Sequence, residues 1–132
     1  MADTVIDASA LAAVLFREPE GETVLDRCHG LVLRAPSLLD YEMANICLVK
    51  QRRYPDLAPK LISQFADYGK LALVREQVHI HSVRELAERT GLTAYDAAYL
   101  WLAGRHGCTL TTLDKKLDQA WRALQADSAP NH

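Results

Sequence analysis

The sequence is poor in cysteine, and its cysteines form no recognisable pattern. Cys28, Cys47 and Cys108 lie far apart, with no CxxC pair and no Cys/His spacing that a zinc ion would need. Their odd number and wide separation predict neither a disulfide scaffold nor a zinc site. Reduced thiols of this kind are typical of a cytoplasmic protein.

The sequence also lacks a net positive charge and long hydrophobic runs. Fifteen Lys and Arg residues against 17 Asp and Glu residues give a formal net charge of −2. A protein that coats nucleic acid is expected to be basic, so contact with a polyanion would need a local patch or bound cations. The N-terminal segment lacks the basic start of a signal peptide, and no apolar run approaches the ~20 residues of a membrane span. We therefore expect a cytoplasmic protein that does not enter a membrane.

Internal repeats, low-complexity tracts and linkers are absent, so the 132 residues predict one domain with one core. Short apolar runs at residues 4–6, 31–35, 71–76 and 108–112 are predicted strands, and they alternate with predicted helices. This alternation predicts an α/β fold. Its central parallel sheet would have about four or five short strands, with helices on both faces.

The boundaries of the helices are predicted from capping residues and breakers. Ser9 is expected to cap the first helix, and residues 55–68 are expected to form a single helix. The last helix is expected to start at Asp114. We therefore predict a domain at residues 1–126 and a frayed C-terminal tail at residues 127–132.

Four carboxylates interrupt the apolar pattern of these elements. Asp7 directly follows the first predicted strand and Asp114 follows the last one, at the carboxyl ends where parallel sheets bind ligands. Glu42 lies on an otherwise apolar line of a long helix that also carries Asn45. Asp96 is the one charged residue in AYDAAYLWLAG. Burying an unpaired charge is costly, so each carboxylate needs a partner or a proton.

Each carboxylate also has a purely structural explanation. Asp7 would accept backbone N–H groups in a turn, and Asp114 would cap the last helix. Glu42 would reach solvent at the edge of its helix. Asp96 stands three residues after Thr93, as in a capping box. On this alternative the protein is a non-enzymatic binding module whose acids only cap helices.

Taken together, the four carboxylates favour a metal site. Two carboxylates ~4 Å apart repel each other by ~4 kcal/mol at an effective dielectric of 20, so a cluster needs protons or cations. Oxygen ligands without His or Cys select Mg²⁺ or Mn²⁺, and such sites suit phosphodiester hydrolysis by metal-activated water. A haloacid-dehalogenase-type phosphatase also places Asp after its first strand, but it uses a DxD pair, and here Ser9 takes the second position.

Four segments resemble motifs of the PIN-domain nucleases, and within them the VapC-like toxins of bacterial toxin–antitoxin pairs. In chain order they are VIDASAL, SLLDYEMANICL, LTAYDAAYLWLA and CTLTTLDKKL. They bracket nearly the whole chain, and YDAAYLWLA followed by TTLD is the most specific part. The resemblance therefore implies a single PIN-like domain.

The resemblance also implies roles for individual residues. Asp7 and Asp96 would be the principal metal ligands, while Glu42 and Asp114 would hold a second cation or orient the hydrolytic water. Residues implied to support the site by hydrogen bonds are Ser9, Asn45 and Thr112.

Activity and partners follow from the same resemblance. It implies an endoribonuclease that uses one or two Mg²⁺ or Mn²⁺ ions, cuts tRNA or ribosomal RNA loops and leaves a 5′-phosphate and a 3′-hydroxyl. A homodimer and an inhibitory antitoxin protein are implied as partners. Lys115 and Lys116 follow Asp114 directly and are candidate RNA phosphate contacts. PIN domains also process RNA outside toxin–antitoxin systems, and this alternative stays open.

Overall fold

The protein is built on a parallel sheet of four strands, seen in a computed structural model that describes residues 2–128. The strands are β1 (Asp3–Ile6), β2 (Val32–Pro36), β3 (Leu73–Glu76) and β4 (Thr109–Thr111). Their order in the sheet is β3-β2-β1-β4. The chain therefore moves outward from β1 to β3 and then returns to the free side of β1. The predicted α/β fold and the positions of its strands are confirmed.

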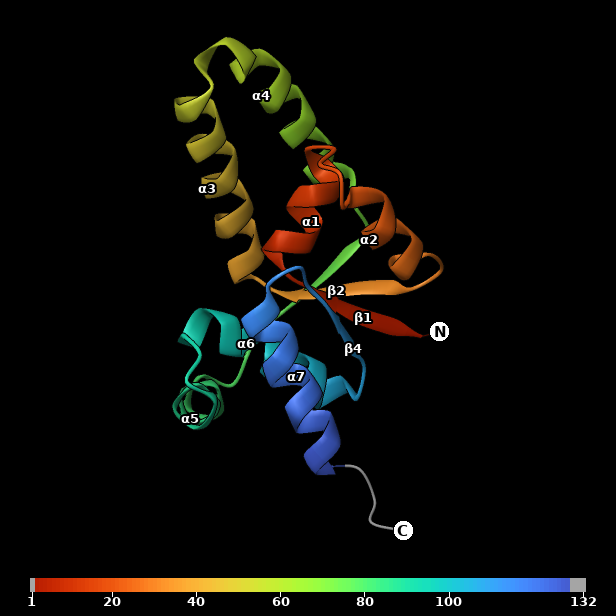
Figure 1. The fold of residues 1–132 in the computed structure, drawn as a ribbon, viewed down its shortest axis with the longest axis vertical. Coiled ribbons are helices and arrows are strands. Elements are labelled where there is room, and N and C mark those ends of the chain that lie inside the picture. The colour runs from red at the N-terminus through yellow and green to blue at the C-terminus, as the bar shows by residue number, and fades with distance from the viewer. Residues whose placement is uncertain (1, 129–132) are drawn as a thin grey trace.

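Helices cover both faces of this sheet (Figure 1). In that view α1 to α4 lie above the strands and α5 to α7 lie below them. The α-helices are α1 (Ala8–Leu15), α2 (Gly21–Cys28), α3 (Leu38–Arg53), α4 (Ala58–Ala66), α5 (Ile80–Thr90), α6 (Ala94–His106) and α7 (Lys115–Ser128). Within residues 2–128, no helix combines the length and the apolar character that crossing a bilayer requires.

The prediction of one helix over residues 55–68 is wrong. The segment consists of a 3₁₀ helix, η1 (Pro55–Leu57), then α4, and then a second 3₁₀ helix, η2 (Asp67–Lys70). Pro59 explains the first break. It has no N–H and fits only the first turn of a helix, so a new helix begins at Ala58.

The prediction that Ser9 caps the first helix is also wrong, because Asp7 is the capping residue. Its side chain accepts a hydrogen bond from the backbone N–H of Ala10 at 3.0 Å. Since β1 ends at Ile6 and α1 begins at Ala8, Asp7 is the whole connection between them. At the other end of the chain α7 continues to Ser128, and the rest of the predicted tail, residues 129–132, lies outside the described residues.

The hydrophobic core is centred on α6, which packs against β1, β2, β4, α5 and α7. Its residues Ala97, Leu100 and Leu102 are at most 2% exposed. A helix with neighbours on all sides must be apolar nearly all round, which explains the composition of this segment. Any polar side chain on α6 that points inward therefore needs a partner within the fold.

A close contact between two helices fixes the start of α2. A Cβ atom added to Gly21 would lie 2.5 Å from the carbonyl oxygen of Ala13 in α1. Only glycine allows the two backbones to approach this closely. The contact holds α2 against α1, the helix that Asp7 caps.

Candidate functional site

Asp7 lies at the carboxyl end of β1, beside β4. The topology of the sheet reverses direction between these two strands. Ile6 pairs with Thr111 of β4, and the backbone N–H of Asp7 donates to the carbonyl oxygen of Thr111 at 3.2 Å. Open α/β sheets bind ligands at such a switch point, outside the carboxyl ends of their strands. Asp7 is only 5% exposed. The structure thus confirms that this carboxylate lies at the carboxyl end of a strand, as predicted.

Two hydroxyl groups hold the Asp7 carboxylate in place. Ser9 Oγ donates to Asp7 Oδ1 at 2.7 Å, and Thr112 Oγ1 donates to Oδ2 at 2.5 Å. The same hydroxyl oxygens accept backbone N–H groups of the loop after β4, from Leu113 to Ser9 at 3.0 Å and from Asp114 to Thr112 at 3.0 Å. Ser9 and Thr112 therefore tie the first strand-to-helix connection to the last one.

Asp114 starts the last helix. Its Oδ1 accepts the backbone N–H of Leu117 at 3.0 Å, which is the bond of a helix N-cap. The capping explanation is therefore correct for Asp114, and Asp7 caps a helix as well, although the sequence predicts Ser9 for that cap. It leaves the electrostatic role of both carboxylates open, because a capping oxygen keeps further lone pairs.

Asp96 lies in the first turn of α6. Its backbone N–H donates to Thr93 Oγ1 at 3.1 Å, so the predicted Thr93 cap is confirmed. Burial raises the pKa of Asp96, as does the charge of Asp114, while Lys116 acts in the opposite direction. Lys116 is oriented by its own bond, since its Nζ donates to the carbonyl oxygen of Gly91 at 3.2 Å.

Glu42 belongs to α3, which is distant in sequence from the segments that carry the other three carboxylates. It is half-buried on α3, and its Oε1 accepts a hydrogen bond from the hydroxyl of Tyr99 on α6 at 2.5 Å. Burial raises the pKa of Glu42. The Tyr99 hydrogen bond opposes this increase, and the charges of Asp96 and Asp7 add to it.

The four carboxylates share one electrostatic environment, although they come from widely separated segments. Burial raises the pKa of Asp7, and the charge of Asp114 contributes further despite three hydrogen bonds that lower it. Asp114 also raises the pKa of Asp96, while Asp7 and Asp96 both raise that of Glu42. Each carboxylate is therefore close enough to at least two others to influence them.

A hydrated hard cation fits this arrangement better than a metal bound by protein ligands alone. Within residues 2–128, no group of three or more His, Cys, Asp or Glu side chains is placed so that it could hold a metal ion. Mg²⁺ usually keeps several waters and binds proteins through only one or two carboxylates. The oxygen donors match that mode, and so does the repulsion between them, which Lys116 offsets only at Asp96. The ligand roles that the resemblance implies stay predictions.

The sequence also matches a family model, that of the PIN domain, over residues 4–122. The chain belongs to the PIN-domain family. Ribonuclease VapC3 of Pyrobaculum aerophilum is 32% identical to it over 126 residues, a match that covers 91% of this chain and 95% of that protein. The family resemblance inferred from the motifs is confirmed.

Solved structures show the same PIN fold. The crystal structure of PAE2754 from Pyrobaculum aerophilum aligns with a TM-score of 0.65 and 22% identity, covering 96% of each chain. VapC20 of Mycobacterium tuberculosis, described as a sarcin-ricin loop cleaving toxin, aligns with a TM-score of 0.63 and 16% identity, covering 89% of this chain and 95% of that one. At these identities the likeness concerns the fold.

Among the residues described, two of the predicted site residues form no hydrogen bond or ion pair with the candidate carboxylates. Asn45 is exposed one turn after Glu42, and it lines a separate hollow together with Ile46 and Val49. Lys115 is exposed and, unlike Lys116, it is not among the groups that alter the pKa of a candidate carboxylate. Their predicted roles have no support from the geometry.

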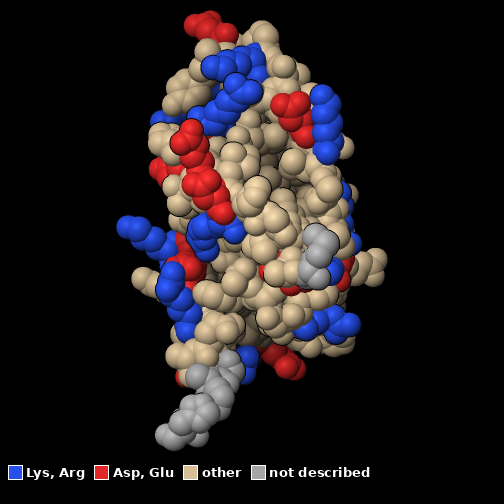
Figure 2. Space-filling view, turned by 90° about the vertical axis from the view of Figure 1, so that its right-hand side faces the viewer, with Lys and Arg blue, Asp and Glu red and all other residues tan. Residues whose placement is uncertain are grey.

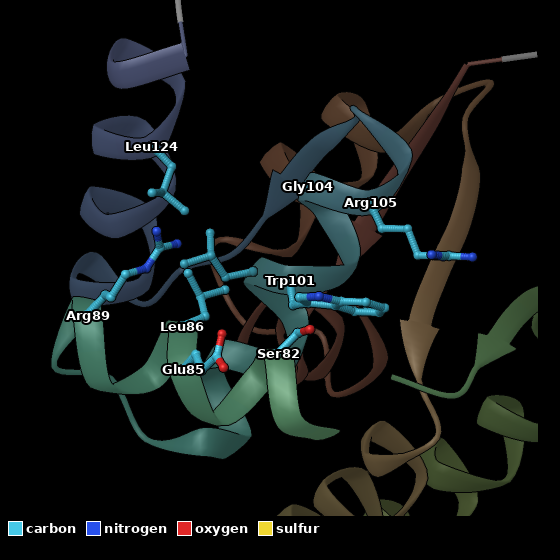
Figure 3. Close-up of a pocket in the computed structure, with 9 residues that line it drawn as sticks. Ser82, Glu85, Leu86, Arg89, Trp101, Gly104, Arg105 and Leu124 are labelled. Carbon is cyan, nitrogen blue, oxygen red and sulfur yellow. The ribbon is translucent and has the colours of Figure 1, made fainter. Parts of the chain in front are cut away.

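A hollow of about 430 Å³ between α5, α6 and α7 lies away from these carboxylates. Figure 3 shows Trp101 and Glu85 on its wall, with Leu124 facing them from α7. Arg105 stacks over the Trp101 ring, with its guanidinium carbon 5.7 Å from the ring centroid. None of the four candidate carboxylates lines this hollow, so it is separate from the candidate site at the carboxyl ends of β1 and β4.

Tyr99 is the residue that sequence reasoning missed. The sequence alone predicts that Tyr99 serves core or dimer packing rather than base stacking, and the side chain is 1% exposed. A buried tyrosine hydroxyl usually needs a hydrogen-bond partner, and Tyr99 stands one turn after Asp96 on the same helix. These two facts together are a signal that the hydroxyl points toward a polar site.

Proposed function

We propose that this protein is a divalent-cation-dependent endoribonuclease that acts in the cytoplasm as the toxin of a toxin–antitoxin pair. The observation that carries the proposal is the electrostatic coupling of the carboxylates at the switch point of a PIN fold. The charge of Asp114 raises the pKa of Asp7 and of Asp96, and the charges of Asp7 and Asp96 raise that of Glu42. Similarity to a ribonuclease over most of both chains supports the choice of RNA as substrate.

The residues of the chain divide the work as follows. Asp7, fixed by Ser9 and Thr112, and Asp96, fixed at the start of α6, would hold a Mg²⁺ or Mn²⁺ ion directly or through water. Glu42 and Asp114 would hold a second ion or orient the attacking water. When bound, the cation would supply a lower pKa for that water and stabilisation of the leaving oxygen. Cleavage by water would leave a 5′-phosphate and a 3′-hydroxyl.

Surface charge supports a need for cations in RNA binding. Figure 2 shows acidic and basic side chains interspersed over one face, so that neither sign covers it. With a net charge of −2 the protein does not attract RNA by its overall charge. Bound divalent ions, together with Lys116 beside Asp96, would supply positive potential where the scissile phosphate lies.

Cleavage assays with a labelled structured RNA, in EDTA and in MgCl₂ or MnCl₂, test the proposal. We expect cleavage only with a divalent cation and at least a ~10²-fold loss in Asp96→Asn, since removing a ligand removes several kcal/mol of transition-state stabilisation. Asp118→Asn is the matched control, because Asp118 pairs with Arg122 at 2.8 Å and is not among the four carboxylates. Cleavage in EDTA, or full activity of Asp96→Asn, would contradict the proposal.

The toxin role has a separate test in cells. Induced expression of the wild-type protein should arrest growth, whereas Asp96→Asn should not. RNA ends sequenced after induction would show whether tRNA or ribosomal RNA is cut. Activity on RNA without growth arrest would favour a role in RNA processing.

A further inference from the structure

Tyr99 is the largest fully buried side chain of the described residues, and its hydroxyl reaches Glu42. It lies on α6, three residues after Asp96, among neighbours that are almost completely buried. A tyrosine at such a position keeps its ring in the core, but its hydroxyl must find a partner. Phenylalanine would fill the same space without that requirement.

The partner of this hydroxyl is one of the candidate site residues. Tyr99 Oη donates to Glu42 Oε1 at 2.5 Å, joining α6 to α3 across 57 positions of sequence. A Glu side chain in water samples many rotamers, and fixing it costs conformational entropy. Here the bond occupies one oxygen, and no described residue donates a hydrogen bond to the other, Oε2. The carboxylate is thus held in one orientation with one oxygen available.

We propose that Tyr99 is a positioning residue that holds Glu42 toward Asp7 and Asp96, so that Oε2 is presented to a divalent cation or to its bound water. The inference rests on the proposed function, because it assigns Glu42 to the cation site. Tyr99 itself is too deeply buried to touch RNA. It acts through Glu42.

A second tyrosine–carboxylate pair in the same protein, Tyr68 and Asp40, is a structural bond with which the Tyr99–Glu42 bond can be compared. Tyr68 donates to Asp40 Oδ1 at 2.5 Å, and the guanidinium of Arg75 also binds Asp40, at 2.8 Å. The charge of Asp40 is thus neutralised within the protein. Glu42 has no such cation among its described neighbours, and the charges that influence it, those of Asp7 and Asp96, are both negative. A cation from solution would complete the Glu42 pair.

Tyr99→Phe tests this role, with Tyr68→Phe as the matched control. Loss of a residue that orients a metal ligand typically lowers metal affinity or activity 10- to 100-fold. We therefore expect Tyr99→Phe to bind Mn²⁺ at least ~10-fold more weakly in calorimetric titration without RNA. Its kcat should fall by a similar factor, while its KM for RNA stays within about twofold because the ring does not contact substrate. Tyr68→Phe should match the wild type in all three quantities.

Glu42 provides a second test that does not depend on the tyrosine. Glu42→Asp shortens the side chain by one methylene, so that it cannot both accept the Tyr99 bond and reach the site, and it should reproduce the losses of Tyr99→Phe. In a Glu42→Ala background, Tyr99→Phe should cause no further loss of kcat.

The outcomes separate this inference from the proposed function. Wild-type Mn²⁺ affinity and kcat in Tyr99→Phe would overturn the positioning role, and so would additive losses in the double variant. Equal losses in Tyr68→Phe would overturn it too, since they would mean a general effect on the fold. If the wild-type protein neither binds Mn²⁺ nor cuts RNA, the proposed function itself fails.

Discussion

Replacing Asp7 with Asn should abolish RNA cleavage while leaving the metal-free protein as stable as the wild type, or more stable. The carbonyl oxygen of Asn can keep the bonds from Ser9 and Ala10, and Asn caps helices as well as Asp does. The amide nitrogen takes the place of Oδ2, where it faces the hydroxyl of Thr112. The local fold therefore survives the substitution.

Two opposing contributions set the magnitude. Exchanging the charge-assisted bond from Thr112 for a neutral one costs ~1 kcal/mol. Removing the charge also removes the cost of burying that charge and its repulsion by Asp114. Both effects raise the pKa of Asp7 in the wild type. Two unit charges ~6 Å apart repel by ~3 kcal/mol at an effective dielectric of 20. We therefore expect the free energy of unfolding to rise by 0 to ~2 kcal/mol, or up to ~8 °C in Tm.

Thermal unfolding in EDTA and in excess MnCl₂, beside a cleavage assay, measures both effects. The wild type should gain ~2.7 kcal/mol when the cation is present at 100 times its Kd, and the Asn variant should gain much less. Asp7→Ala is the control for the cap, because it loses the bonds as well and should fall ~0.5–2 kcal/mol below the Asn variant. An Asn variant that is more than ~2 kcal/mol less stable than the wild type in EDTA, or that cuts RNA at the wild-type rate, would refute the reasoning.

Two further predictions concern pH and packing. Burial raises the pKa of Asp7, Glu42 and Asp96 above their ordinary values of 3.8, 4.5 and 3.8. In the pH window between each ordinary pKa and the raised pKa of the folded state, the folded protein binds more protons than the unfolded one. The stability of the metal-free protein should therefore increase as pH falls from neutrality into that window, and excess Mn²⁺ should weaken this trend. Melting curves in EDTA in which Tm falls steadily on acidification would contradict the prediction. Gly21→Ala should destabilise the fold by ~1–3 kcal/mol because its Cβ meets the backbone of α1, whereas Gly69→Ala, with nothing within 4 Å, should stay within ~0.5 kcal/mol in denaturant titrations.

Much of the fold could be predicted because its signals are local. Apolar runs mark the strands, and the cap at Thr93 and the left-handed Gly107 mark both ends of α6. The carboxylates after β1 and β4 could be placed at one sheet edge for the same reason, since all strands of a parallel sheet point the same way. The order of the strands has no local signal, because it depends on which pairs bury the most surface.

The parts that could not be predicted depend on contacts between distant residues. The bond from Tyr99 to Glu42 joins two helices, and the direction in which Glu42 points follows from how α3 and α6 pack. The capping role of Asp7 depends on the absence of any loop between β1 and α1. Pro59 could have shown the break before α4, since proline is confined to the first helical turn.

The pairing of β1 with β4 has a consequence for synthesis of the chain on the ribosome. β1 is among the first segments to emerge, but its neighbour β4 is made only after residue 108. A nascent chain that stops earlier contains Asp7 without the hydroxyl of Thr112 and without Asp114, and one edge of β1 has no partner. The full set of carboxylates therefore assembles only when translation is almost finished. Under the proposed function, a chain that ends before Asp114 is therefore expected to cut no RNA.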